Sequence, residues 1–168
     1  MNPLKFKLAQ QTDIPKLVDL INAAYRQQHG NSWTSEAEIV TGQRINTAQL
    51  EHALSQDNVQ LWTAIQDGEI VACIGLTFNE HDVEIGTFCI APHLQNQGIG
   101  KQVLDFAENY VRQQISLKHQ HLNDFVMWVL NVRTELIAYY ERRGYVQTGM
   151  IDDYPLGADV GKPIVDCI

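Results

Sequence analysis

A glycine-bearing turn between an expected strand and an expected helix constrains this chain more than any other feature of its sequence. The turn reads Gln95-Asn96-Gln97-Gly98-Ile99-Gly100; it follows a strand-like run over 83–90 and opens a helix-like run over 101–113. A turn at a helix N-terminus presents unpaired backbone N–H groups and the positive end of the helix dipole. Such a turn binds anions, and phosphate most often. The sequence therefore predicts a phosphate-bearing ligand.

Two other glycine motifs do not fit this turn. A Walker A loop places Ser or Thr after its Lys, whereas Gln102 follows Lys101. A dinucleotide fingerprint needs a third Gly three residues after the second, and here that position is Val103. What remains is Gln-x-x-Gly-x-Gly, which by itself also fits an ordinary strand-to-helix turn.

The segments around the turn narrow the choice. The strand-like run ends at Ala91-Pro92, and apolar residues with a helical period follow the turn, namely Val103, Leu104, Ala107, Tyr110 and Val111. An apolar strand-like run over 125–130 ends at Asn131. The segment Ala138-Tyr139-Tyr140-Glu141-Arg142-Arg143-Gly144-Tyr145 completes the series.

In this order and spacing the segments resemble the GNAT superfamily, the acetyl-CoA-dependent N-acetyltransferases. The resemblance rests on Gln95-x-x-Gly98-x-Gly100, on Asn131, and on Tyr140 within an Ala-x-Tyr-Glu-x-x-Gly-aromatic signature. It covers nearly the whole chain and is firmest over 83–145. It implies the α/β (α+β) GNAT fold, a mixed central sheet of about six to seven strands flanked by helices on both faces. The expected organisation is a single domain over 1–168, and homodimers are common in the family.

Periodicity and turn signals predict the individual elements. Strands are expected over 4–9, 59–66, 69–78, 83–90, 125–130, 145–150 and 163–168. Asp67-Gly68 is a strong hairpin signal between the second and third of these strands. Helices are expected from an N-cap at Thr12 to residue 25, from a cap at Thr34 or Ser35 to Val40, over 47–54, over 101–113 and before Gly144.

Composition limits the classes of partner. The chain has 168 residues, of which 45% are apolar and 19% charged, and no apolar run approaches the ~18 residues of a membrane helix. The net charge of −8 argues against nonspecific nucleic-acid binding. Cys73, Cys89 and Cys167 are widely spaced, without metal-ligand spacing, and are expected to be free thiols in a reducing cytoplasm. A small-molecule or peptide amine is the expected partner, with no metal, nucleic acid or membrane.

The resemblance implies how acetyl-CoA would bind. The backbone N–H groups from Gln97 through Ile99 to Gly100 would hold the pyrophosphate, while Gln95 and Asn96 shape the loop. Gly98 and Gly100 would allow close approach of the backbone or a positive φ. Lys101 would add charge or remain solvated. The pantetheine arm would lie beside Cys89 and Ile90, with a hydrogen bond from Asn131, and a backbone N–H near Phe88 to Ile90 would polarise the thioester carbonyl.

The resemblance also implies the reacting groups. A protonated amine must lose a proton before it attacks. Glu84 is the expected base, because histone acetyltransferases of this superfamily place a glutamate six residues before the position of Ile90. Strand alternation predicts that Glu84 shares a face with Gly86 and Phe88. Glu36, or Asp152 with Asp153, could do the same work from loops, and a solvent-facing Glu84 is the alternative.

Tyr140 is the expected general acid for the departing CoA thiolate. The alternative is core packing, because Tyr140 shares a helix face with Leu136 and Ile137, and Tyr139 would point elsewhere, about 100° around the helix. In this fold the acceptor pocket would be framed by Trp33, Glu36, Arg44 and Tyr154. The aromatic pair suits an amine, and Arg44 suits a substrate carboxylate.

The sequence thus predicts an N-acetyltransferase that transfers acetyl from acetyl-CoA to a primary amine by direct attack in a ternary complex. A non-catalytic acyl-CoA-binding or sensing domain is the alternative, as is an interaction module that has lost CoA binding. An acyl-carrier role for Cys89 has weak support. Neither the acceptor amine nor the acyl-chain length follows from the sequence.

Overall fold

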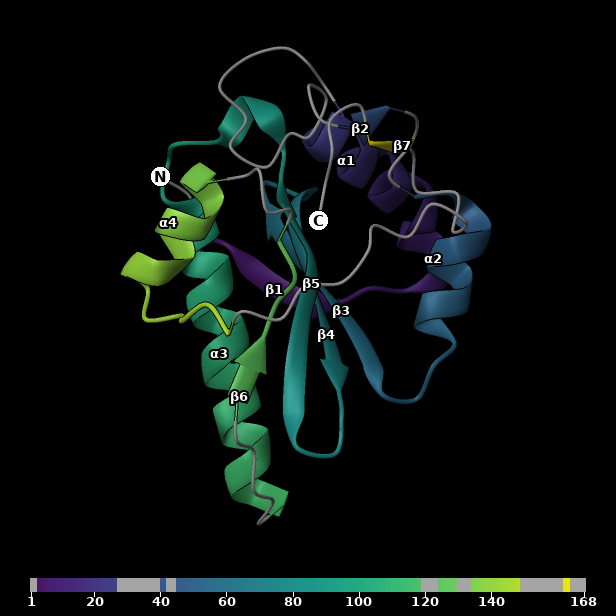
Figure 1. Ribbon diagram of the computed structural model, residues 1–168. Coiled ribbons are helices and arrows are strands. Elements are labelled where there is room, and N and C mark those ends of the chain that lie inside the picture. Colours follow the sequence, from purple (N-terminus) through teal and green to yellow (C-terminus); the bar gives the residue numbers. More distant parts are fainter. Residues whose placement is uncertain are drawn as a thin grey trace.

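The computed structural model describes residues 3–26, 40–41, 45–118, 124–129, 134–148 and 162–163. In chain order the elements are β1 (Lys5–Leu8), the 3-10 turn η1 (Gln11–Asp13), α1 (Ile14–Arg26), β2 (Val40–Thr41), α2 (Thr47–Leu54), β3 (Val59–Gln66), β4 (Glu69–Phe78), β5 (Asp82–Ile90), the 3-10 turn η2 (Pro92–Leu94), α3 (Ile99–Lys118), β6 (Asp124–Val126), α4 (Thr134–Arg142) and β7 (Lys162–Pro163). Figure 1 shows helices on both sides of a central sheet.

The central sheet is mixed, as expected. Its strands lie in the order β1-β3-β4-β5-β6; β6 runs parallel to β5, and the other neighbours are antiparallel. The sheet has five strands among the described residues, fewer than the six to seven expected. Two expected strands are not part of this sheet in the described part of the chain: residues 145–148 form no strand, and Pro163, the first residue of the expected last strand, pairs with Val40 of β2 in a separate two-stranded sheet.

The hairpin signal and the bounds of three elements are confirmed. The strands β3 and β4 have the predicted bounds, and the hairpin residues Asp67 and Gly68 take left-handed φ values of 53° and 81°. The helix α2 also has its predicted bounds. Its capping box joins Asn46 and Gln49, each side chain accepting from the other residue's N–H, at 2.8 and 2.9 Å.

Several predicted boundaries are wrong. Thr12 does not cap α1, which begins at Ile14 after η1; here Asp13 Oδ2 accepts from Gln10 N–H at 2.9 Å. Val40 lies in β2 rather than at a helix end, and residues 27–39 before it are outside the described residues. β6 ends at Val126 because residues 127–129 leave the sheet, and α3 continues to Lys118.

Each face of the sheet is covered by its own pair of helices (Figure 1). On one face α1 and α2 enclose a core that includes Leu17, Ile21, Leu50, Cys73 and Cys89. On the other, α3 and α4 enclose the larger core, which includes Ile74, Val83, Ile85, Phe88, Ile90, Val103, Leu104, Val111 and Tyr140. None of the described helices is long and apolar enough to cross a membrane.

A β-bulge reverses the alternation of β5. Its register with β4 shifts between Cys73 and Gly75, and Thr87 on the bulged strand takes a left-handed φ of 48°. A bulge adds one residue to a strand, so the residues beyond it exchange faces. Phe88 consequently joins Val83 and Ile85 in the larger core.

The expectation that Glu84 shares a face with Phe88 is therefore wrong. Glu84 lies between two residues of the α3–α4 core, Val83 and Ile85, so its side chain is on the opposite face, toward α1 and α2. The strict alternation that predicted otherwise holds from Glu84 to Gly86 and fails at the bulge.

Candidate active site

The loop before α3 takes the backbone conformations that its sequence favours. Asn96 has φ 65° and Gly98 has φ 79°, in the left-handed region that suits these two residue types. A Cβ placed on Gly98 would meet no atom within 4 Å, so the space in front of the loop is open. Gly100 differs: it lies in the first turn of α3 and is buried. The predicted positive φ thus holds for Gly98 alone of the two.

Gln95 fixes this loop to the end of β5. Its side chain is only 9% exposed, and its Nε2 donates to the Ile90 carbonyl oxygen at 3.2 Å. At the other end of the loop, the Gly98 carbonyl oxygen accepts from the Gln102 N–H at 3.2 Å, which starts the hydrogen-bonding pattern of α3. The loop is therefore held at both ends while its middle is exposed.

The strands β5 and β6 separate after a short parallel pairing. The pairing ends with Glu84 opposite Val126, and the following residues, 127–129, form no strand. Among the described residues, Ile85 to Ile90 thus have no strand partner on this side. We call this edge the β5 wedge. It runs from Glu84 at its closed end to the loop beyond Ile90, about 20 Å at ~3.3 Å per residue.

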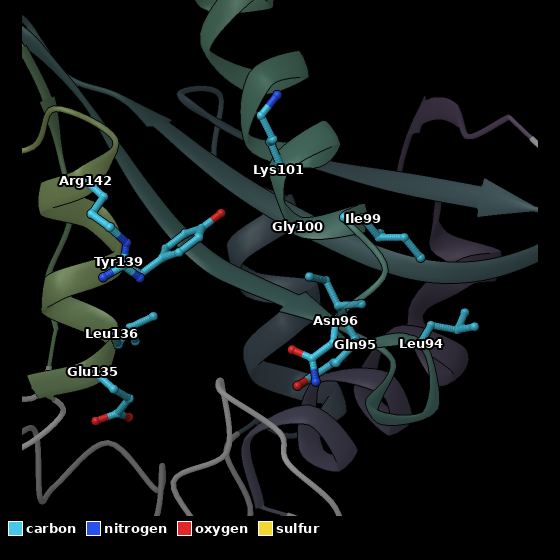
Figure 2. Close-up of a pocket in the computed structure, with 12 residues that line it drawn as sticks. Leu94, Gln95, Asn96, Ile99, Gly100, Lys101, Glu135, Leu136, Tyr139 and Arg142 are labelled. Atoms are coloured by element: carbon cyan, nitrogen blue, oxygen red, sulfur yellow. The ribbon is translucent and has the colours of Figure 1, made fainter.

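A cavity of about 380 Å³ lies between the loop and α4 (Figure 2). Its lining includes seven of the residues predicted to bind the cofactor: Ile90, Gln95, Asn96, Gly98, Ile99, Gly100 and Lys101. Phe88, Cys89 and Gln97, also predicted, are not part of the lining. The structure therefore brings most of the predicted cofactor residues to one cavity.

Sequence reasoning missed the wall that α4 contributes. Glu135, Leu136, Tyr139 and Arg142 line the cavity from this helix, and Leu94 lines it from η2. The α4 residues have helical spacing and share one side of the helix. The sequence periodicity places these residues on one side of α4. The neighbouring residues do not indicate that this side faces the loop before α3.

Tyr140 is expected at the cofactor site and Tyr139 away from it, but the structure places Tyr140 in the core and Tyr139 at the cavity. Tyr140 is 8% exposed and belongs to the α3–α4 core, where its ring makes edge contacts with Tyr139 and Tyr145 at centroid distances of 5.4 and 5.8 Å. The cavity is lined by Tyr139, whose hydroxyl extends between the α4 and α3 walls in Figure 2. The expectation that Tyr139 points away from the cofactor site is wrong, because α4 docks with that side toward the loop.

Glu84 has the electrostatic character of a base. It is half-buried at the closed end of the β5 wedge, and its carboxylate makes no ion pair or side-chain hydrogen bond with a described residue. Burial raises the pKa of its carboxyl above the ordinary value, and the nearby charge of Asp82 raises it further. A carboxylate with a raised pKa accepts a proton more readily than an ordinary surface Glu.

The bulged part of β5 is tied to its surroundings by buried groups. The Tyr25 hydroxyl, from α1, donates to the Phe88 carbonyl oxygen at 2.8 Å. Cys73 and Cys89 are free, fully buried thiols with sulfur atoms 3.4 Å apart, which confirms the sequence prediction for these two residues. Because the Cys89 thiol is buried and does not line the cavity, the acyl-carrier alternative gains no support.

Arg143 connects α4 to α3. Its Nη2 donates to Asp105 Oδ1 at 2.7 Å and lies 3.5 Å from Glu108 Oε1, which also accepts from the Tyr145 hydroxyl at 3.1 Å. The side chains of Arg143 and Glu108 are only 15% and 14% exposed. The hydrogen bond from Arg143 lowers the pKa of the Asp105 carboxyl. We call these four residues the α3–α4 brace, because they fix the helices on either side of the cavity.

Removal of the central cation should destabilise the protein. We expect Arg143→Met to lower the free energy of unfolding by about 2 kcal/mol, because Asp105 loses its partner at 2.7 Å and the mostly buried Glu108 carboxylate keeps Arg112, 3.6 Å away, as its remaining counter-ion. The adjacent Arg142→Met is the control: Arg142 is exposed and has no hydrogen bond or ion pair to a described residue, so its loss should stay within about 0.5 kcal/mol. Urea titrations measure both, and equal losses would contradict the brace.

The brace should also weaken in acid. The folded-state pKa of Asp105 is lowered, so its contribution is present above the unfolded value of about 3.9 and is lost as the pH falls through the folded value. The stability gap between wild type and Arg143→Met should therefore narrow below about pH 4.

Other predicted site residues lie outside the described residues. These are Trp33, Glu36, Arg44, Asn131, Asp152, Asp153 and Tyr154. Within the described part of the chain, no cluster of three or more His, Cys, Asp or Glu side chains could hold a metal ion.

Comparison with known proteins identifies the family. The sequence model of the acetyltransferase (GNAT) family matches residues 16–145, a range that contains the loop, the β5 wedge and α4. The chain belongs to the acetyltransferase (GNAT) family. This GNAT chain therefore comes from a family of acyltransferases that use acetyl-CoA.

The individual relatives of this GNAT protein have low sequence identity or match only part of the chain. The uncharacterized protein YdhI of Bacillus subtilis (strain 168) is 31% identical over 80 residues, 48% of this chain and 45% of YdhI, so the match spans about half of that relative. The ribosomal-protein-S18-alanine N-acetyltransferase from Escherichia coli aligns with a TM-score of 0.68 at 14% identity, over 96% of this chain and 88% of that one. A predicted acetyltransferase from Clostridium acetobutylicum, crystallised with acetyl-CoA, has a TM-score of 0.61 at 14% identity, over 92% and 97%. These two structures share the fold.

Proposed function

We propose that this chain is an N-acetyltransferase that moves acetyl from acetyl-CoA to a primary amine by direct attack in a ternary complex. One observation carries the proposal: a single cavity joins the left-handed loop at the α3 N-terminus to the end of β5, beyond the part of that strand that pairs with β6. The first feature suits a diphosphate and the second suits a chain of amide groups. The related E. coli fold is that of an N-acetyltransferase, and the C. acetobutylicum structure contains acetyl-CoA.

The residues of the site fit this cosubstrate. The backbone N–H groups from Gln97 to Gly100 would bind the diphosphate in front of α3, where Gly98 leaves open space. Backbone groups of β5 between Ile85 and Ile90, beyond its pairing with β6, would hydrogen-bond the pantetheine amides; the Phe88 and Ile90 carbonyl oxygens already accept from Tyr25 and Gln95. Backbone N–H groups near Phe88 to Ile90 would stabilise negative charge on the carbonyl oxygen. Acetyl-CoA, when bound, supplies the acetyl group as an activated thioester.

Glu84 and Tyr140 would move the two protons of the reaction. As the amine nitrogen bonds to the carbonyl carbon and the carbon–sulfur bond breaks, Glu84 takes a proton from the nitrogen and Tyr140 gives one to the departing sulfur. Glu84 is on the α1–α2 face of β5, whereas Tyr140 is in the core on the other face. In the proposed reaction the amine would therefore arrive on one side of β5 and the thiol would leave on the other.

The proposed acceptor is a primary amine. Trp33, Glu36, Arg44 and Tyr154 remain its proposed contacts. A panel of polyamines, amino acids, aminoglycosides and peptides, with release of free CoA thiol as the readout, tests the proposal directly. An amine that releases thiol and gains an acetyl mass supports it; binding of acetyl-CoA without transfer to any amine contradicts it.

A non-catalytic acyl-CoA-binding domain is the second candidate. The observation that favours it is the burial of Tyr140 in the core, outside the cavity lining. Such a domain would bind acetyl-CoA in calorimetry, release no thiol with any amine, and be unaffected by Tyr140→Phe.

The pH profile tests the base. We expect wild-type kcat/KM to fall as the pH drops through the raised pKa of Glu84, and Glu84→Gln to lower it about 100-fold near neutral pH, because general base catalysis contributes roughly 10²- to 10⁴-fold. Glu80→Gln, the same change at an exposed residue before β5, is the control and should match wild type. An unchanged rate for Glu84→Gln at every pH would exclude Glu84 as the base.

A further inference from the structure

Two adjacent arginines at the end of α4 have opposite surroundings. Arg143 is held by Asp105 and Glu108 in the α3–α4 brace. Arg142 is exposed, lines the cavity and makes no hydrogen bond or ion pair with any described residue (Figure 2). The guanidinium of Arg142 is therefore available to a ligand in the cavity, whereas that of Arg143 is committed to the fold.

The other charged groups of the cavity leave this role to Arg142. Lys101 lines the α3 wall, but its Nζ forms an ion pair with Asp105 Oδ2 at 3.4 Å, which partly neutralises its positive charge. Glu135 lines the α4 wall seven residues before Arg142, about 10 Å along the helix at 1.5 Å per residue. Figure 2 shows Glu135 and Arg142 at opposite ends of this wall. The Arg142 end is thus the part of the α4 wall suited to an anion.

We propose that Arg142 binds the 3′-phosphate of coenzyme A and makes the chain selective for CoA thioesters over their 3′-dephospho forms. This inference rests on the proposed function. Coenzyme A carries a diphosphate and a separate ribose 3′-monophosphate, and the loop before α3 accounts for the diphosphate alone. A guanidinium presents paired N–H donors that match a phosphate monoester, and such charge-assisted pairs are the stronger hydrogen bonds.

A purely structural role for Arg142, as a cation at the C-terminus of α4, predicts a different result. A cation in the last turn of a helix is favoured by the helix dipole whether or not a ligand is present. An arginine that served only this role would not distinguish ligands with and without the 3′-phosphate.

Calorimetric titration with CoA and with 3′-dephospho-CoA separates the two roles without an acceptor amine. We expect wild type to bind CoA about tenfold more tightly than 3′-dephospho-CoA. Arg142→Gln should lose affinity for CoA and keep it for 3′-dephospho-CoA, so the ratio of the two dissociation constants falls to about one. Arg142→Lys, which keeps the charge but not the paired donors, should give an intermediate ratio. Lys16→Gln, which removes a distant exposed cation, should keep the wild-type ratio.

The outcomes also separate this inference from the proposed function. A wild-type ratio near one, or an unchanged ratio in Arg142→Gln, overturns the assignment of the 3′-phosphate and leaves acetyl transfer standing. Failure of wild type to bind CoA at all overturns both. Because each variant is judged by a ratio of two ligands on the same protein, a general loss of stability does not imitate the expected result.

Discussion

Gly98→Ala is expected to weaken the binding of CoA about 100-fold, or about 2.8 kcal/mol at 1.4 kcal/mol per factor of ten. Gly98 has φ 79°, which an L side chain adopts at a cost of about 1–2 kcal/mol, and its Cβ would project into the open space in front of the loop. The backbone would either relax and turn its N–H groups away or place a methyl group against the diphosphate. Calorimetry with CoA measures the loss.

Gly68 provides a control with the same backbone conformation. It has φ 81° in the β3–β4 hairpin, and a Cβ there would also meet no atom within 4 Å. Gly68→Ala should lower the free energy of unfolding by about 1–2 kcal/mol, the same backbone strain as at Gly98. Its affinity for CoA should stay at the wild-type value. If both variants lost affinity equally, the effect of Gly98 would be strain on the fold and not contact with the ligand.

Tyr140→Phe is expected to lower kcat about 100-fold with little change in the affinity for acetyl-CoA, because general acid catalysis contributes roughly 10²- to 10⁴-fold. The Phe ring keeps the edge contacts with Tyr139 and Tyr145, so the urea midpoint should remain close to wild type. Steady-state kinetics with the best amine of the panel gives kcat and KM separately.

The matched variant is Tyr139→Phe. Tyr139 lines the cavity and Tyr140 does not, so the two neighbours offer a direct test of which hydroxyl serves the departing sulfur. The signature predicts that Tyr139→Phe changes kcat by less than about threefold, a barrier change below 1 kcal/mol. A large loss in Tyr139→Phe with a normal Tyr140→Phe would transfer the role of acid to the cavity residue.

Features set by neighbouring residues could be predicted from the sequence. The Asp67-Gly68 hairpin and the left-handed Gly98 each depend on the conformational preferences of a few consecutive residues. The family resemblance added the order of the elements and most of the cavity lining.

Features set by distant contacts could not be predicted in this way. The bulge at Thr87 arises from the register of β5 with β4, and it decides which face receives Phe88. The choice between Tyr139 and Tyr140 depends on how α4 is rotated against α3. The brace that fixes this rotation joins Arg143 to Asp105 and Glu108, which precede it by 38 and 35 residues. No local pattern contains that information.

The separation of β5 from β6 has a consequence for association between molecules. An unpaired strand edge is a template for aggregation when another protein can reach it. Here the edge ends at residues that are buried, Phe88 to Ile90, and two of its carbonyl oxygens already accept from Tyr25 and Gln95. The outer border of the sheet, β1, instead presents the exposed side chains of Lys5 and Lys7, whose charges repel a second copy. The protein can thus keep a hydrogen-bonding backbone edge available to a ligand without promoting aggregation.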